Sequence, residues 1–280
     1  MRIRTYLTLI AISVCALLGG AQTLTATYME LADSADYYTR HSRWADAERV
    51  IIKALRHEPA NPSNHLLWSN LGIVREQLCN LPGALEAFDI GLASAPRSTT
   101  LLTNRARIYM SEGKSGEAIA DLSRALEVDS TLQWPRKMRG ILYLAQAKPK
   151  EALADFTDYK NRFGEDADVA EGAASAEAGL GNPDKAMEYY EESLRIEPSQ
   201  STLVKMLLTA CSFGILERYE EKLREGIEKY PRCGELYLLR GTLHKARYET
   251  EKTEIDRKLA TEFGASTDLI NTLLPIKTKK

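Results

Sequence analysis

The sequence predicts an all-α protein: an α-solenoid of about seven antiparallel helix pairs that follows an N-terminal signal peptide. Three features of the 280-residue chain support this prediction. Small residues recur with a period of 34 residues, large apolar residues recur with the same period, and prolines separate the amphipathic runs. Apolar residues make up 44% of the chain and charged residues 27%, which excludes a disordered or collagen-like protein.

The first 21 residues resemble a secretory signal peptide. Two arginines precede an apolar run over 7–18, and small residues lead up to Ala21. As a helix that run would rise only about 18 Å, which is too short to cross a bilayer. We expect cleavage after Ala21, with Ala26 as the second choice and an uncleaved membrane anchor as the alternative. Export to the periplasm or another part of the cell envelope follows from this interpretation.

Three series of residues repeat in parallel along the chain. In each series the first interval is 37 residues and the next three are 34, so one insertion near 61–63 accounts for the difference. A small residue lets two helix backbones approach, and a bulky one fills the space between neighbouring pairs. The series are Ala47, Ala84, Ala118, Ala152 and Ala186; Ala35, Gly72, Ala106, Gly140 and Ala174; and Ile51, Phe88, Leu122, Phe156 and Tyr190.

Prolines mark where helices are expected to end and begin. Proline cannot continue a helix, but it suits the first helical position, where its missing N–H would have no partner. Prolines follow amphipathic runs at Pro59, Pro96 and Pro198 and open the next runs at Pro82, Pro149 and Pro183.

One segment shows a family resemblance: Trp68-x2-Leu71-Gly72, then Ala84-x3-Phe88, then Pro96. This pattern resembles the tetratricopeptide repeat, a helix–turn–helix unit that stacks into a superhelix. The resemblance implies an array over 28–265 and a C-terminal tail over 266–280. Its units are expected to start near residues 28, 65, 99, 133, 167, 201 and 234.

The later units depart from the pattern. Leu208 replaces the small residue of the sixth unit, and Thr253 replaces the alanine of the seventh. The segment 249–263 is dense in charge, as the polar outer face of a terminal repeat requires. The tail can add a short helix through Leu269 and Leu273. Earlier in the chain, 167–179 consists almost wholly of small residues, which predicts weak packing there.

No pattern of residues points to catalysis. The four histidines have no paired-ligand spacing, and no phosphate-binding glycine loop or nucleophile elbow occurs. We therefore predict no enzyme activity, no metal and no cofactor. The net charge of −2 argues against nucleic acid as a partner. Three cysteines follow the signal peptide; we expect free thiols, with a Cys211–Cys233 bridge as the alternative.

The resemblance implies that a protein or peptide partner binds the concave groove, which the first helix of each unit lines. The predicted function is a scaffold or assembly factor of the cell envelope. The alternative is a small-ligand or glycan-binding envelope protein that uses the same groove, and the oligomeric state is not predicted. The candidate groove residues are Asn70, Ile73, Asn104, Arg107, Trp134, Lys137, Ile141 and Lys205.

Asn104, Arg107 and Lys137 resemble part of a carboxylate clamp, in which cations and an amide hold the C-terminal carboxylate of a peptide. The match is incomplete, because Ile73 and Ile141 stand where polar residues would be expected. The alternative is an ordinary polar groove wall.

A second ambiguity concerns an apolar stripe formed by Trp134, Ile141 and Leu144. This stripe either packs into the core or forms an exposed patch for a peptide.

Overall fold

A computed structural model of the chain describes residues 27–275, and the described part is helical with short turns and no strand. The predicted signal peptide and both predicted cleavage sites lie outside the described residues. No helix within 27–275 is both long and apolar enough to cross a bilayer. The chain divides into two compact units, of which unit 1 ends at Pro135 and unit 2 begins at Arg136.

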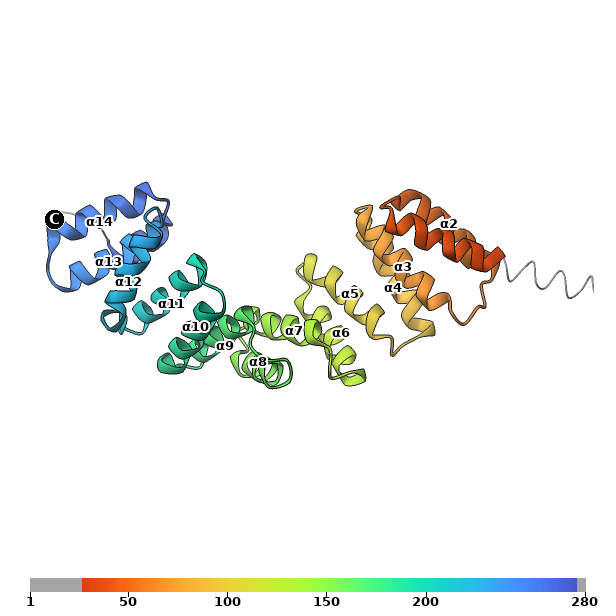
Figure 1. Cartoon of the computed structure of the whole chain (residues 1–280), viewed down its shortest axis with the longest axis horizontal. Helices are drawn as coiled ribbons and strands as arrows, with labels where there is room; N and C mark the ends of the chain where they lie inside the picture. The colour runs from red at the N-terminus through yellow and green to blue at the C-terminus, as the bar shows by residue number, and fades with distance from the viewer. Residues whose placement is uncertain (1–26, 276–280) are drawn as a thin grey trace, which may run out of the picture. The chain divides into compact units, whose positions relative to one another are not determined.

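The helices of unit 1 are stacked as successive antiparallel pairs (Figure 1). The first helix of each pair and the second are joined by a short turn. The pairs are 27–40 with α2 (Trp44–His57), α3 (Asn64–Gln77) with α4 (Leu81–Ser94), and α5 (Thr99–Ser111) with α6 (Ser115–Val128).

Unit 2 has the same kind of internal arrangement, and the boundary between the units falls within α7 (Gln133–Ala145). The first helices here are α7, α9 (Ala167–Gly179), α11 (Gln200–Ser212) and α13 (Gly234–Ala246). Their second helices are α8 (Pro149–Phe163), α10 (Pro183–Ile196), α12 (Glu220–Lys229) with a short 3-10 turn at Leu216–Tyr219, and α14 (Thr250–Glu262). With α15 (Thr267–Leu273) after them, these pairs confirm the predicted all-α solenoid.

The small and large residues of the repeat series meet as predicted. A Cβ atom added to Gly72 would lie 2.3 Å from Cε1 of Phe88, a ring with no exposed surface. The Phe156 ring lies between two glycines: an added Cβ would come within 2.7 Å of it at Gly140 and within 2.5 Å at Gly172. Each ring therefore fills space that only a residue without a side chain leaves open.

A buried charge pair that the sequence pattern did not predict recurs in three of the helix pairs. Each pair joins an arginine on a first helix to an aspartate 16 residues later on the second. The three aspartates are 1–4% exposed, so each carboxylate depends on its arginine for compensation. The pairs are Arg105–Asp121, Arg139–Asp155 and Arg240–Asp256.

The C-terminal helix α15 covers the last helix pair. Ile270 and Leu274 are buried against the cluster that includes Leu238 and Ala260. A Cβ on Gly241 would lie 2.7 Å from Leu274 Cδ1, so the glycine allows this close contact. The tail therefore contributes to the apolar core of unit 2 beyond the charged α14.

The cysteines of the described residues are free thiols. Cys79 is exposed, Cys211 is half-buried and Cys233 is buried. Burial raises the pKa of both the Cys211 and the Cys233 thiol, which makes them poor nucleophiles.

Candidate functional site

The predicted groove residues all lie on first helices. Within each unit, we call the exposed side chains of the first helices its first-helix face: those of α3 and α5 in unit 1, those of α9, α11 and α13 in unit 2, and those of α7 at the boundary. Unit 1 carries Asn70, Ile73, Asn104, Arg107 and Trp134, and unit 2 carries Lys137, Ile141 and Lys205.

In unit 1 the candidate cation is already paired. Arg107 Nη2 of α5 lies 2.5 Å from Glu76 Oε2 of α3, one helix pair earlier. Ile73 is only partly buried and packs against the cluster that contains Phe88, so its side chain contributes to the core as well as to the face. Asn70 of α3 and Asn104 of α5 are half-buried.

In unit 2, Lys137 Nζ of α7 binds two carboxylates, 3.0 Å from Asp166 and 2.6 Å from Asp168. Burial would lower the pKa of Lys137, but the hydrogen bonds that its ammonium donates to Asp168 and Asp166 outweigh burial and raise the pKa above its ordinary value. Burial would raise the pKa of Asp166, but Lys137 and the N–H of Val169 hold it below its ordinary value. Both groups therefore stay charged at neutral pH.

Lys205 is also paired with a carboxylate of a neighbouring helix pair. Its ammonium on α11 pairs with Glu171 of α9, which also accepts a hydrogen bond of 2.5 Å from the Thr202 hydroxyl. Each cation among the candidate residues thus bridges to a carboxylate of the neighbouring helix pair. A bound carboxylate would have to compete with these partners, so the ion pairs favour the ordinary polar wall over a carboxylate clamp.

The apolar stripe on α7 is exposed and does not pack into the core. Trp134 and Ile141 are each 38% exposed. Arg136 occupies the buried side of the helix instead, where its Nη1 lies 2.6 Å from Asp158 Oδ2 of α8. Leu144 is the exception among the stripe residues, because it packs against the cluster around Phe156.

Lys137 lies between Trp134 and Ile141 on the same side of α7, since residues three, four and seven apart share one helix face. We call Trp134, Lys137 and Ile141 the α7 patch. The patch offers two apolar side chains around a lysine that Asp166 and Asp168 hold in place. Such a surface can bury an apolar side chain of a partner without leaving a free charge beneath it.

Within residues 27–275 no group of three or more His, Cys, Asp or Glu side chains could hold a metal ion.

Comparison with known proteins identifies the family. Two family models described as tetratricopeptide repeat match the chain, one over 33–99 and 137–201 and the other over 99–132. A tetratricopeptide repeat protein from Parabacteroides merdae is 26% identical with a TM-score of 0.62, covering 89% of this chain and 97% of that one. No curated protein matches the sequence.

Two more distant structures share the fold. The C-terminal part of a TPR repeat-containing protein from Cytophaga hutchinsonii is 15% identical with a TM-score of 0.67, covering 86% of this chain and 98% of that one. The pilF protein of Pseudomonas aeruginosa is 18% identical with a TM-score of 0.55, covering 74% and 94%. Proteins with this repeat generally bind other proteins and are not catalysts. The chain belongs to the tetratricopeptide repeat family.

Proposed function

We propose that this protein is an exported, non-catalytic scaffold or assembly factor of the cell envelope, and that its first-helix face binds a segment of a partner protein. The α7 patch is the observation that carries the proposal. The three candidate cations of the face are engaged by carboxylates of the same chain, whereas Trp134 and Ile141 remain exposed. Binding energy is therefore available from apolar burial more than from charge.

The side chains of the patch indicate which kind of partner segment it could bind. Exposed tryptophans are prominent among the residues that dominate protein interfaces. Asp168 lies next to the patch, because its carboxylate binds Lys137. Its side chain is 76% exposed, so it can also accept a hydrogen bond from the partner. We therefore propose a segment with an apolar anchor side chain next to a hydrogen-bond donor. A glycan would stack on Trp134 alone and would not need Ile141.

Replacing Trp134 by alanine together with Ile141 by serine should weaken partner binding at least about tenfold, because both anchors of the patch are lost. The measurement is co-purification from a cell-envelope extract, followed by titration of the recovered partner against both baits. Because apolar contacts dominate, binding to the unmodified chain should persist at about 0.5 M salt.

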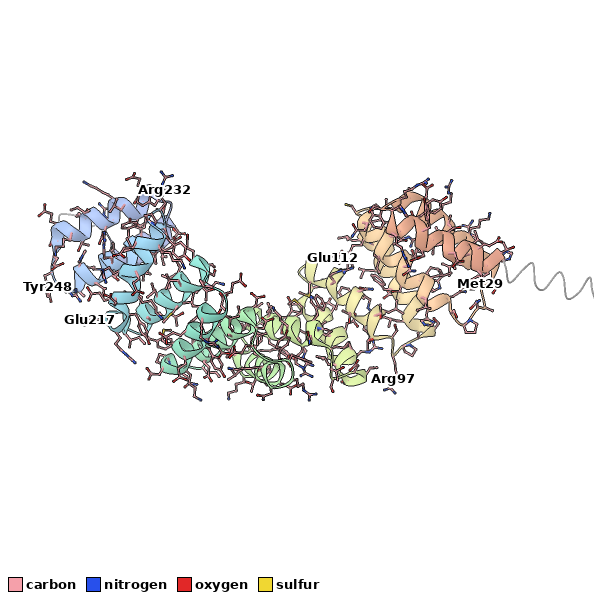
Figure 2. All side chains as sticks on the ribbon, in the orientation of Figure 1. Met29, Arg97, Glu112, Glu217, Arg232 and Tyr248 are labelled. Atoms are coloured by element: carbon pink, nitrogen blue, oxygen red, sulfur yellow. The ribbon has the colours of Figure 1, made fainter. Side chains whose placement is uncertain are left out.

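The matched control is Tyr248→Ala. Tyr248 is 93% exposed at the turn between α13 and α14, where Figure 2 shows its side chain away from the packed helices. This variant should bind as the unmodified chain does. A partner that binds the patch variant and the control equally well would show that another surface is used. Loss of binding to the Ile141→Ser single variant would argue against a glycan.

Export has its own test. N-terminal sequencing of the protein isolated from cells should begin at Gln22, or at Thr27 if the second cleavage site is used. The processed chain should fractionate with the cell envelope. A chain that begins at Met1 and fractionates with the cytoplasm would contradict export.

A further inference from the structure

A row of exposed side chains runs along α14, the second helix of the last pair in unit 2. Glu251, Ile255, Lys258 and Glu262 are all exposed and follow one another at intervals of four, three and four residues. Residues at these spacings share one face of a helix. The opposite face of α14 carries the buried residues of the helix. We call the four exposed residues the α14 stripe.

The centre of the stripe is apolar. Ile255 is 50% exposed and lies between Glu251 and Lys258, four residues after the one and three before the other. An exposed apolar side chain flanked by opposite charges is the arrangement of a small interface. The apolar contact then supplies binding energy, and the charges set which surface fits.

Tyr248, at the turn before α14, occupies a position that the other helix pairs give to small residues. Its φ is +60°, in the left-handed region that bulky side chains rarely adopt. The same position recurs at intervals of 33 to 37 residues, each time with a positive φ. The tyrosine gains little from packing within the chain, because it is 93% exposed. A strained and exposed aromatic residue next to the stripe is therefore a second sign of a contact with another molecule. The small residues at this position are Ser42, Cys79, Gly113, Ala147, Gly181 and Gly214.

The charges of the stripe are available to a partner. Within residues 27–275, neither Glu251 nor Lys258 pairs with an opposite charge. Their neighbours on α14 differ, since Arg257 lies 2.7 Å from Glu254. An acidic residue near one end of the stripe and a basic residue near the other make the surface complementary to itself.

The order of these charges selects one orientation of two copies. When two α14 helices run antiparallel about a twofold axis between positions 254 and 255, Glu251 and Lys258 each lie about 5 Å along the helix from the axis. Glu251 of each copy is then level with Lys258 of the other, and the two Ile255 side chains meet beside the axis. A parallel arrangement would place Glu251 opposite Glu251 and Lys258 opposite Lys258, which repel.

We propose that α14 is a self-association surface, on which a second copy of this chain packs its own α14 in the antiparallel direction. Two Glu251–Lys258 ion pairs flank the paired Ile255 side chains, and each Tyr248 reaches the level of Glu262 of the other copy. Contact through one helix of each copy is smaller than a standard interface, so the dimer is weak and depends on concentration. The stripe contains no residue of the α7 patch, so the dimer does not rest on the proposed partner binding.

Sedimentation velocity of the processed chain from about 10 µM to about 1 mM tests the proposal. The average mass should rise from that of a monomer toward that of a dimer. Glu251→Lys and Lys258→Glu each place like charges opposite each other at both ion pairs, so each should weaken the dimer at least about tenfold. Glu225→Lys is the matched control, because it makes the same charge change at an exposed position of α12. It should leave the dimer unchanged.

Mixing the two variants separates pairing from a general effect of charge. The Lys258→Glu chain carries two acids on its stripe, and the Glu251→Lys chain carries two lysines. Each alone should be monomeric, whereas an equal mixture should associate as a heterodimer. The double variant with both substitutions exchanges the charges and should restore the homodimer. Partner binding is measured well below these concentrations, so Tyr248→Ala remains a valid control there.

A chain that stays monomeric up to about 1 mM would overturn the proposal. So would a dimer that survives both single substitutions, or a mixture of the two variants that stays monomeric although circular dichroism shows both to be folded. Trp134→Ala with Ile141→Ser should leave the dimer intact. Loss of the dimer in that variant would place the contact on the α7 patch and contradict a role for α14.

Discussion

Replacing Asp121 by alanine is expected to lower the free energy of unfolding by about 3 kcal/mol. The carboxylate is 3% exposed and accepts two hydrogen bonds from Arg105, of 2.7 Å from Nε and 2.6 Å from Nη2. The hydrogen bonds that Arg105 donates to Asp121 raise the pKa of Arg105 above its ordinary value. Without Asp121, the largely buried guanidinium keeps only the exposed carboxylate of Asp89 as a partner, and this loss of compensation is the main source of the destabilisation.

The control for this prediction is the second carboxylate on the same arginine. Arg105 Nη1 also lies 2.6 Å from Asp89, whose side chain is 57% exposed. Asp89→Ala should cost less than about 1 kcal/mol, because water compensates an exposed charge. Urea unfolding followed by circular dichroism measures both variants. Equal losses for Asp89→Ala and Asp121→Ala would show that burial does not set the strength of this pair.

Gly72→Ala should destabilise the protein by about 2 kcal/mol, although alanine is the better helix former. Helix propensity alone favours the substitution by up to about 1 kcal/mol. The new Cβ, however, would lie 2.3 Å from Cε1 and 2.5 Å from Cζ of Phe88. The Phe88 ring has no exposed surface into which it could move, so α3 and α4 must separate. Overpacking of this kind typically costs about 1–3 kcal/mol.

A double-mutant cycle isolates the contact between Gly72 and Phe88. Phe88→Leu removes the ring atoms that the new methyl group meets, so Gly72→Ala should cost less in that background. Gly116→Ala is the control, since an added Cβ there meets nothing within 4 Å. It should be neutral or slightly stabilising, and thermal melting compares all four variants. Additive losses in the cycle would mean that the clash with Phe88 is not the cause.

The repeat architecture was predictable because its signals are local. Proline sets where a helix can begin. A small residue on one helix and a large one on the next, such as Gly72 and Phe88, indicate a close contact between neighbouring helices. Each signal recurs in several units, so one degenerate unit does not hide the pattern. The arginine–aspartate pairs at a separation of 16 residues repeat in the same way. These pairs were not predicted, because a charged residue usually indicates a solvated surface.

The candidate site was only partly predictable. The groove positions were predicted from helix periodicity, which puts Trp134 and Ile141, seven residues apart, on one face of a helix. Whether that stripe is buried depends on the rotation of α7. The buried side of α7 carries Arg136, which is 7% exposed and pairs with Asp158. The pairing stabilises a rotation that exposes Trp134, and no periodicity in the sequence expresses it.

The order of the helices and the close contacts within each pair can be deduced from the amino-acid sequence, because they depend on backbone propensity and on neighbours one helix away. Whether a cation of the first-helix face is free or paired depends on distant partners: Arg107 pairs with Glu76, which lies 31 residues away in the sequence. The small residues of 167–179 are visible in the sequence, but their burial is not. Ala170 and Ala173 are 4% and 3% exposed, because the side chains of the helices packed against α9 cover them, and only the tertiary structure decides that packing.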